Sequence, residues 1–219
     1  MPETCRGIEC LKELISRFDG VKVGLPLLLK EGPGFLRKVA EEVEGYPILR
    51  IADFKLADIG DVMVSSLEAI KTLGYDAAIA HAFTGKRGGL ETLLSKAREL
   101  GVKVILVVSM SHDGSKEFYD KHFGEFLELA KELGAWGVVV PATRPQLISE
   151  ARSALSGKIR ILSPGVGVQG AGFGSALCSG ADYEIVGRSV LRSSNPIETA
   201  ESIIEKMKEV VRSCRMSSA

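Results

Sequence analysis

The chain has 219 residues, of which 45% are hydrophobic, and this is enough to build the core of one large domain. Its 28 basic and 28 acidic residues cancel, which excludes the broad positive surface that nucleic-acid binding requires and favours a small ligand bound by local contacts. No proline- or serine-rich linker, low-complexity run or block of like charges interrupts the sequence, so we expect a single domain over residues 1–219.

The four cysteines, Cys5, Cys10, Cys178 and Cys214, lack the short spacing of a zinc site or a redox pair. We expect free thiols in a reducing cytoplasm, while a bridge between distant positions stays open. The N-terminus has no charged-then-apolar leader, and no apolar run approaches the roughly 20 residues of a membrane span. The sequence therefore predicts a soluble, cytoplasmic protein without a membrane partner.

Short apolar strands alternate with amphipathic helices along the chain, beginning with a helix over residues 4–18. The predicted strands cover residues 21–25, 48–54, 77–83, 102–110, 137–141, 159–165 and 183–188. The later helices are predicted at residues 33–43, 61–73, 87–99, 115–133, 145–153 and 196–211, with a weak one near 173–180.

This alternation is typical of a parallel sheet covered by helices, which is an α/β fold. A (β/α)8 TIM barrel needs eight strands, and the sequence supplies seven. We therefore predict a barrel with the first strand apparently missing from this chain, since that strand would precede residue 4. A doubly wound open sheet of seven strands is the alternative.

Charged residues gather where the strand at residues 48–54 ends. Residues i and i+2 of a strand point to the same side of a sheet, so Asp53 and Lys55 should emerge side by side, with Asp58 in the loop beyond. Lys22 lies among apolar residues of the preceding strand, where it is either at an exposed edge or held by carboxylates. The carboxyl ends of barrel strands usually form the active site, although Asp58 could instead cap the next helix.

Two glycine-rich segments near the C-terminus, residues 163–170 and 185–188, together indicate an anion site. Glycines let backbone N–H groups approach phosphate oxygens, and the guanidinium of Arg188 can bind two of these oxygens at once. Barrels usually bind phosphate at this point, before the last two helices. The three histidines lack the spacing of a metal cluster, so the sequence predicts no metal site.

Residues 53–59, Asp-Phe-Lys-Leu-Ala-Asp-Ile, resemble the D-x-K-x-x-D signature of the orotidine 5′-monophosphate decarboxylases, especially their short archaeal members. The likeness runs over nearly the whole chain. Residues 21–27 resemble the family's second strand, residues 110–112 its pyrimidine-contacting loop, and residues 164–170 and 186–188 its phosphate loops. Five matches in this order make the resemblance specific.

The resemblance implies a (β/α)8 barrel that forms a homodimer, with sites at the dimer interface and no metal or organic cofactor. It implies the decarboxylation of orotidine 5′-monophosphate (OMP) to uridine 5′-monophosphate (UMP), the last step of de novo pyrimidine biosynthesis. The implied catalytic residues are the charged tetrad Lys22, Asp53, Lys55 and Asp58. The implied substrate-binding residues are Ile59, Ser111, Pro164, Gln169, Gly187 and Arg188.

In the implied mechanism, Lys55 protonates C6 of the pyrimidine as carbon dioxide leaves, and Asp53 lies beside the substrate carboxylate. Asp58 and Ile59 reach in from the partner subunit. A carbanion with no adjacent electron sink needs a positioned cation, and preorganised charge is usually the largest catalytic effect.

Three other residues would bind the rest of the nucleotide under the same resemblance. Ser111 would contact the pyrimidine edge, while Gln169 and Arg188 would close over the 5′-phosphate. The glycine-rich loop 165–175 would act as a lid, because binding energy from a remote phosphate can be used to order the site.

The chain departs from the family pattern at its N-terminus and at two positions after the signature. The family's first strand ends in an aspartate that contacts the ribose, whereas this chain begins at Met1-Pro2-Glu3-Thr4. Gly60 and Val62 stand where the family usually has proline and threonine. These departures leave two alternatives, a Mg²⁺-dependent sugar-phosphate decarboxylase or aldolase of the same superfamily, towards which Gly60 points, and a noncatalytic nucleotide-phosphate binder. The Pro-Gly-x-Gly-x-Gln loop favours the OMP decarboxylase.

Overall fold

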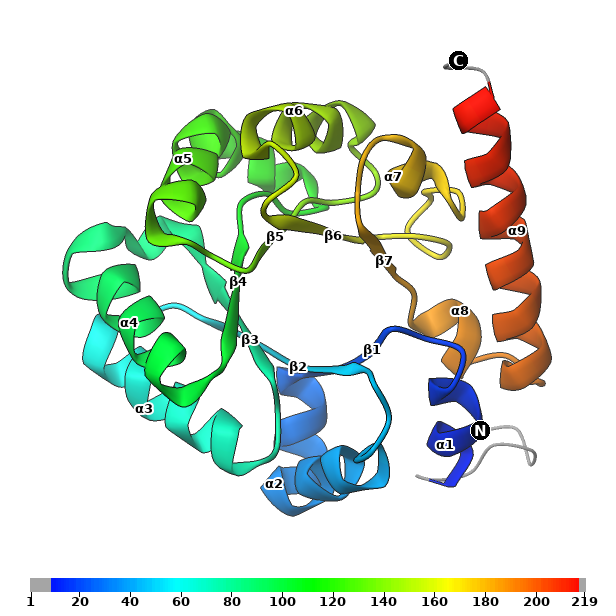
Figure 1. The fold of residues 1–219 in the computed structure, drawn as a ribbon, viewed down its shortest axis with the longest axis horizontal. Coiled ribbons are helices and arrows are strands. Elements are labelled where there is room, and N and C mark those ends of the chain that lie inside the picture. Colours follow the sequence, from blue (N-terminus) through cyan, green and yellow to red (C-terminus); the bar gives the residue numbers. More distant parts are fainter. Residues whose placement is uncertain (1–8, 217–219) are drawn as a thin grey trace. The chain divides into compact units, whose positions relative to one another are not determined.

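The computed structural model describes residues 9–216 (Figure 1). These residues divide into two compact units. The N-terminal unit contains residues 9–107 and 132–136, and the C-terminal unit contains residues 108–131 and 137–216. Neighbouring strands within each unit are parallel, as the alternation of strands and helices predicts.

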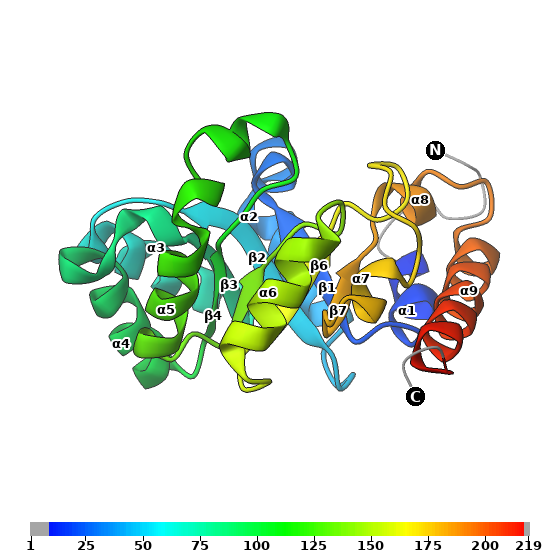
Figure 2. The same cartoon turned by 90° about the horizontal axis from the view of Figure 1, so that it is seen from above.

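The N-terminal unit has a sheet of four strands that pair in the order of the chain. The strands are β1 (Gly20–Gly24), β2 (Leu49–Leu56), β3 (Ala77–His81) and β4 (Lys103–Val107). The helices are α1 (Glu9–Ile15), α2 (Leu25–Glu42), α3 (Gly60–Thr72) and α4 (Glu91–Leu100), with a 3-10 turn at Ala82–Thr84 and a π-helical turn at Lys86–Leu90. Helices α3 and α4 lie side by side in Figures 1 and 2, and they cover nearly fully buried apolar strands, as expected for a parallel sheet.

Helix α2 is longer than the helix predicted at residues 33–43. It begins at Leu25, directly after β1, and has Pro26 in its first turn, where the missing N–H is tolerated. It breaks at Gly32, whose φ of 78° and ψ of 170° lie outside the helical region, and it resumes at Pro33. The sequence pattern therefore predicted only the part of α2 after the break, because Gly32-Pro33 interrupts the helix.

A hydrogen-bonded corner fixes the amino end of β3. Gly74, with φ of 91°, leads out of α3 to Tyr75, which is 1% exposed and donates its hydroxyl to the Leu36 carbonyl at 3.0 Å. Asp76 then accepts hydrogen bonds from Nε and Nη2 of Arg50, each at 2.8 Å, and from the Arg50 backbone N–H at 3.1 Å. This carboxylate ties the start of β2 to the start of β3.

The C-terminal unit contains β5 (Gly137–Val139), β6 (Arg160–Pro164) and β7 (Tyr183–Ile185), again paired in the order of the chain. Its helices are α5 (Phe123–Leu133, whose last two residues belong to the N-terminal unit), α6 (Pro145–Leu155), α7 (Ser175–Cys178), α8 (Arg188–Leu191) and α9 (Pro196–Met216). Helix α9 packs against α7 and α8 (Figure 2). Before β7, Asp182 repeats the arrangement of Asp76, since it binds Arg152 and accepts a hydrogen bond from the Ile161 N–H of β6 at 2.8 Å.

The helix predicted over residues 115–133 is present only from Phe123 onward, so the first part of that prediction is wrong. Two 3-10 turns, Asp113–Glu117 and Asp120–His122, occupy the earlier residues. Asp120 Oδ1 accepts hydrogen bonds from the hydroxyls of Ser109, at 2.8 Å, and Ser115, at 2.7 Å. These contacts within the loop compete with the helical hydrogen bonds that local periodicity would favour.

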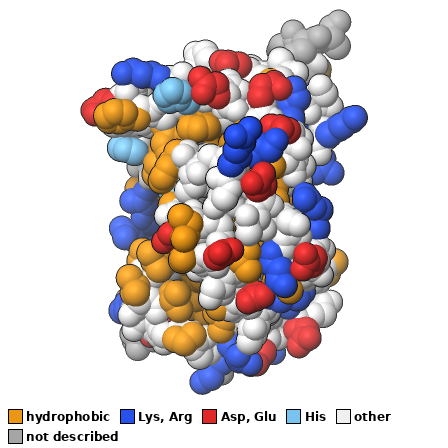
Figure 3. All heavy atoms as spheres, turned by 90° about the vertical axis from the view of Figure 1, so that its left-hand side faces the viewer, with side chains coloured by type: hydrophobic (Ala, Val, Ile, Leu, Met, Phe, Trp, Pro, Cys, Tyr) orange, Lys and Arg blue, Asp and Glu red, His pale blue; other side chains and the backbone are white. Residues whose placement is uncertain are grey.

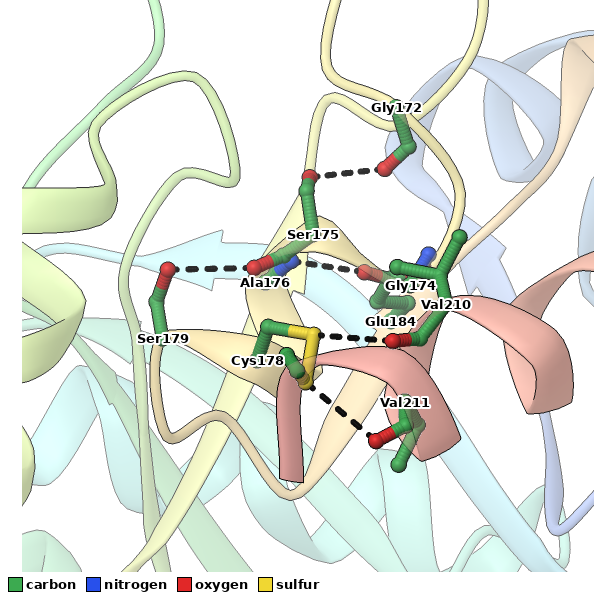
Figure 4. Close-up of a disulfide and its surroundings, with 10 residues drawn as sticks. Gly172, Gly174, Ser175, Ala176, Cys178, Ser179, Glu184, Val210 and Val211 are labelled. Carbon is green, nitrogen blue, oxygen red and sulfur yellow. Dashed lines mark hydrogen bonds between the residues drawn. A yellow bond between two sulfur atoms is a disulfide. The ribbon is translucent and has the colours of Figure 1, made fainter. Parts of the chain in front are cut away.

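Cys178 and Cys214 form a disulfide, so the expectation of free thiols is wrong for this pair. The bond joins α7 to α9 across a sequence separation of 36 residues, with the two Cα atoms 6.0 Å apart (Figure 4). Short-range spacing could not reveal it, because the two cysteines meet only when α9 packs on α7. The side chains of Cys5 and Cys10 lie outside the described part of the chain.

Residues 9–216 contain seven strands, of which β1 is the first. The prediction that the first barrel strand is missing concerns the N-terminus of the chain, and residues 1–8 lie outside the described residues. Within the described range, every helix is too short or too polar to cross a lipid bilayer.

Candidate active site

The carboxyl end of β2 contains a β-bulge that directs its charged side chains. Ala52 pairs with Ala78 of β3, but the next paired residue of β2 is Leu56, which lies opposite Ala80. Residues 53–55 therefore have only one residue of β3 beside them. Bulges bend a strand, re-aim its side chains and are common next to active sites.

Asp53 lies between two lysines at this bulge. Its Oδ2 accepts a hydrogen bond from Lys22 Nζ at 2.7 Å, and its Oδ1 accepts one from Lys55 Nζ, also at 2.7 Å. Lys22 comes from β1, which pairs with β2 so that Gly24 stands opposite Asp53. The structure thus brings together three residues of the expected tetrad, and it shows that Lys22 is held by a carboxylate.

The charge on Asp53 is stabilised by its two partners. Burial on its own would raise the pKa of Asp53, but the ion pairs with Lys22 and Lys55 more than offset this effect and place the pKa below its ordinary value. Asp53 is therefore ionised at neutral pH, with only 9% of its side chain exposed. One carboxylate faces two ammonium groups, so the cluster has a net positive charge that favours an anionic ligand.

Lys55 has an unusual backbone conformation, with φ of 50°. Among the described residues, Ser156 is the one other non-glycine residue with positive φ. The left-handed region costs a residue with a Cβ about 1 kcal/mol or more, and such outliers gather at functional sites. The bulge and this conformation together aim the Lys55 amine at Asp53 while 43% of its side chain stays exposed.

His81, the last residue of β3, belongs to the same surroundings, although the sequence assigned it no role. Burial and the Lys55 ammonium lower the pKa of His81, against the opposing influence of Asp53. Its ring lies 5.1 Å from the ring of Phe83, measured between centroids. The imidazole is therefore a neutral, half-buried group near the exposed lysine at pH 7.

Asp58 and Ile59 lie in the loop after the bulge and are exposed. Asp58 Oδ1 accepts a hydrogen bond from the Ile59 N–H at 2.7 Å, and the Ile59 side chain leaves this residue 65% exposed. Ile59 is the N-cap residue of α3, so Asp58 binds a backbone N–H at the start of this helix, as the structural alternative expects. Within the described residues, Asp58 forms no ion pair with the Lys22–Asp53–Lys55 cluster.

The glycine at position 60 has a packing explanation. A Cβ there would lie 2.6 Å from the Cβ of Thr92 on α4 and 3.0 Å from the carbonyl oxygen of Gly88. Any larger residue would force α3 away from this neighbour. Gly60 therefore gives no support to one enzymatic activity over another.

Ser111 lies in a loop of the C-terminal unit that is held by a half-buried network. Asp120 binds both Ser109 and Ser115, as described above, and it also forms an ion pair with Arg144. Arg144 donates a hydrogen bond from Nη2 to the His112 carbonyl oxygen at 3.0 Å and thereby holds the residue next to Ser111 in place. Ser111 itself is exposed and lines a shallow hollow together with Thr143, Arg144, Gln146 and Leu147.

The first glycine-rich segment follows Pro164, the last residue of β6. Gly165 has φ of 99°, and the space beside it is occupied by Gln169, whose Oε1 lies 3.0 Å from the position a Cβ would take. Gly167 has φ of 75° and packs against Ser189. A side chain at either glycine would therefore be strained and would displace a neighbour.

The second glycine-rich segment ends at Gly187, which precedes Arg188, the first residue of α8. Both residues are exposed. Arg188 pairs with no acidic side chain among residues 9–216, so its guanidinium is available to an anion. Because Gly167 packs against Ser189, the two glycine-rich segments meet beside Arg188 within the C-terminal unit.

Comparison with known proteins identifies the family. Residues 1–203 match the model of the orotidine 5′-phosphate decarboxylase / HUMPS family. An orotidine 5′-phosphate decarboxylase of Aeropyrum pernix is 46% identical over 187 residues, covering 85% of this chain and 75% of that protein. One from Thermococcus kodakarensis is 44% identical, covering 87% of this chain and 85% of that protein. The chain belongs to this family.

Solved structures of family members support the same assignment. Orotidine 5′-monophosphate decarboxylase from Sulfolobus solfataricus matches with a TM-score of 0.84 and 36% identity, over 94% of each chain. The enzyme from Methanocaldococcus jannaschii, complexed with the inhibitor BMP, matches with a TM-score of 0.81 and 31% identity, over 91% of this chain and 92% of that one. The prediction of an α/β fold of the TIM-barrel class is thereby confirmed, with seven strands among the described residues.

Three residues that the structure places in the site or at the loop that bears Ser111 were not assigned to the site from the sequence. His81 had a usable signal, because it ends an apolar strand as Asp53 does. Asp120 and Arg144 had none, because they are 24 residues apart and Asp120 fell inside a predicted helix.

Proposed function

We propose that this chain decarboxylates OMP to UMP without a cofactor, using Lys22, Asp53, Lys55 and Asp58 as its catalytic residues. The observation that supports this most strongly is the shared carboxylate of Asp53, to which both lysine amines are bound at 2.7 Å. This activity is also the one named for the relatives from Aeropyrum pernix and Thermococcus kodakarensis and for the solved structure from Sulfolobus solfataricus.

The chemistry follows from the charges at the β2 bulge. When the bond between C6 and the carboxylate breaks, its electron pair stays on C6 and carbon dioxide leaves. Lys55 Nζ then gives a proton to C6, so the product is neutral at that carbon. Asp53, held ionised by its lysines, lies beside the departing carboxylate and disfavours the charged ground state, while the fixed ammonium stabilises the transition state.

The remaining residues bind the nucleotide away from the reacting bond. Ser111 contacts the pyrimidine edge, and Pro164, Gln169, Gly187 and Arg188 form the phosphate site. The exposed guanidinium of Arg188 and the left-handed glycines beside Gln169 suit a phosphate that arrives from solvent.

The chain acts as a cytoplasmic homodimer in this proposal, with residues 1–219 as one catalytic domain and with Asp58 and Ile59 completing the partner's site. Support comes from large apolar side chains exposed just after β1, β2 and β3. They are Leu25 (41%), Ile59 (65%), Val62 (46%) and Phe83 (56%). Because these strands are parallel, the four residues lie at the edge of the sheet that also bears Lys55, and exposed apolar groups of this size suit a partner surface. Figure 3 shows one face on which hydrophobic side chains reach the surface beside charged ones.

The first test is an ultraviolet assay that follows the loss of the orotate chromophore from OMP. The wild-type chain should turn over OMP, and Lys55→Ala should abolish turnover while it still binds UMP. A chain that binds OMP and never consumes it would instead be a nucleotide-phosphate binder. Activity that disappears with EDTA and returns with Mg²⁺ would support the sugar-phosphate alternative.

Mixing two inactive variants tests whether Asp58 serves the partner. A dimer of one Lys55→Ala subunit and one Asp58→Ala subunit has one site with both defects and one intact site. Random mixing makes half of the dimers mixed, so about a quarter of the wild-type activity should return. No recovery, in a mixture proven to exchange subunits, would place Asp58 and Lys55 of one subunit in the same site.

A further inference from the structure

The loop that bears Gln169 is internally ordered. The Gly167 N–H donates to the Ala171 carbonyl at 2.8 Å, and the Gly170 N–H donates to the Gly167 carbonyl at 2.8 Å. Val168, Gln169 and Gly170 are exposed at the tip of this loop. The tip is therefore a preformed turn, and its orientation depends on how the two ends of the loop are held.

The far end of the loop is held at Gly174. This residue is buried, has φ of 86°, and a Cβ on it would lie 2.9 Å from the Cβ of Val210 on α9. It would also lie 3.2 Å from the Met207 carbonyl oxygen. The backbone at Gly174 is thus pressed directly against α9.

Glu184 of β7 fixes the same point with both of its carboxylate oxygens. Its Oε2 accepts a hydrogen bond from the Gly174 N–H at 2.8 Å, and its Oε1 accepts one from the Ala176 N–H at 2.8 Å (Figure 4). Two charge-assisted hydrogen bonds from one half-buried carboxylate define both the position and the direction of the chain as it leaves the loop.

The Cys178–Cys214 disulfide supplies the third attachment. It begins four residues after Gly174 and binds α7 covalently to the last turns of α9 (Figure 4). The Cys178 sulfur lies 3.6 Å from the Val210 carbonyl oxygen, so the bridge and the Gly174 contact involve the same part of α9. Cys178 is exposed, and the bond is therefore accessible to a reductant.

We propose that Glu184 and the Cys178–Cys214 disulfide are positioning groups for the phosphate-binding loop, which hold its end at Gly174 so that Gln169 is ready to close on the 5′-phosphate. This inference rests on the proposed function, because it uses the phosphate role of Gln169. The disulfide makes the closing step sensitive to dithiols, which would reduce it to two thiols with two electrons and two protons.

The effect should depend on the substrate's phosphate. A loosened loop end must be ordered when the phosphate binds, and that cost is subtracted from the binding energy available to the reaction. Orotidine, which lacks the phosphate, does not use the loop. Loss of the attachment should therefore affect OMP and leave orotidine unchanged.

The test compares kcat/KM for OMP and for orotidine in two variants, Glu184→Gln and the double variant Cys178→Ser/Cys214→Ser. We expect kcat/KM for OMP to fall about tenfold, chiefly through KM, and kcat/KM for orotidine to stay within about twofold. Equal losses for both substrates, or no loss for either, would overturn the inference. Arg188→Ala is the reference variant, since it removes a phosphate contact directly.

Reduction of the wild-type chain with dithiothreitol gives a second measurement that needs no substitution. Reduction should reproduce the OMP-specific loss, and it should have no effect on the double variant, which retains Cys5 and Cys10. A reductant effect that persists in the double variant would assign it to other cysteines and contradict the inference. A wild-type chain that fails to consume OMP would refute the proposed function itself. If only Arg188→Ala shows a loss that is specific to OMP, the proposed function stands, and the positioning role of Glu184 and the Cys178–Cys214 disulfide is refuted.

Discussion

The two ends of β2 use the same kinds of charged group in opposite ways. At the start of the strand, Arg50 and Asp76 meet in a two-pronged ion pair, and the Arg50 N–H binds the same carboxylate. At the end, Asp53 binds the separate amines of Lys22 and Lys55. The guanidinium fork matches the planar carboxylate, whereas each lysine uses one of three donors there and keeps the others for solvent or a ligand.

Under the proposed function, this difference separates charges that stabilise the fold from charges that take part in the reaction. The Arg50–Asp76 pair joins the start of β2 to the residue before β3, and in the C-terminal unit Asp182, just before β7, likewise binds the Ile161 N–H of β6. The lysine cluster lies on a bulge and includes a residue with positive φ. In barrels the amino ends of the strands usually support stability and the carboxyl ends support catalysis. The two ends of β2 should therefore respond differently to substitution.

The largest expected effect is on activity, at the carboxyl end. Lys55→Ala should lower kcat/KM for OMP by about 10⁴-fold, because it removes both the proposed proton donor and a fixed positive charge. The melting temperature should fall only slightly, since Lys22 still pairs with Asp53 and alanine removes no packed core atoms. The control is Lys38→Ala, at an exposed lysine of α2, which should leave kcat/KM within twofold of the wild-type value. A loss of less than tenfold in Lys55→Ala would contradict the comparison.

At the amino end, Asp76→Asn should act on stability alone. We expect the free energy of unfolding to fall by about 2 kcal/mol, because an amide cannot accept all the hydrogen bonds from Arg50. Denaturant melts would measure the loss, and kcat/KM at 25 °C should change by less than about threefold. Glu128→Gln, which removes an exposed pair with Lys131, should cost about 0.5 kcal/mol or less. A fall in kcat/KM of Asp76→Asn by more than about threefold at 25 °C would contradict the distinction between the two ends of β2.

The pH dependence of stability gives a further test of the role of Asp76. Burial would raise the pKa of Asp76, but its hydrogen bonds with Arg50 more than offset burial and lower the pKa below the ordinary 3.8. Its contribution to stability is therefore complete above about pH 3.8 and is lost as the pH falls through the folded-state value. The gap between wild type and Asp76→Asn should be constant from pH 7 to pH 5 and should close towards pH 2. A gap of constant size down to pH 2 would show that the carboxylate's charge contributes nothing.

The smallest expected effect concerns His81. Because burial and Lys55 lower its pKa below 6.5, the unfolded chain binds a proton at this residue more readily than the folded chain. Stability should therefore decrease as the pH falls below 6.5, and His81→Gln should show a shallower decrease than the wild type. Thermal melts between pH 7 and pH 5 would measure this difference, which should be smaller than the loss in Asp76→Asn. Parallel curves for the two proteins would contradict the assignment.

The sequence predicted the elements that depend on local pattern. The apolar strands and the i, i+2 spacing of Asp53 and Lys55 are visible in adjacent residues, and the structure has them. The bulge at the end of β2 was not predicted, because it depends on pairing with β3. The loop before α5 was assigned to a helix, because two partners of Asp120, Ser109 and Arg144, come from outside that segment.

The conformation of Lys55 has a consequence for selection in the laboratory. Glycine and asparagine adopt positive φ with less strain than lysine, so either residue at position 55 should reduce the backbone strain of the folded chain. Under the proposed role of Lys55, a screen that selects for heat tolerance alone would therefore replace the wild-type residue and return well-folded proteins without activity. Directed evolution of this barrel therefore needs, in every round, a selection in which growth depends on the product that the enzyme itself makes, or an equivalent demand for turnover.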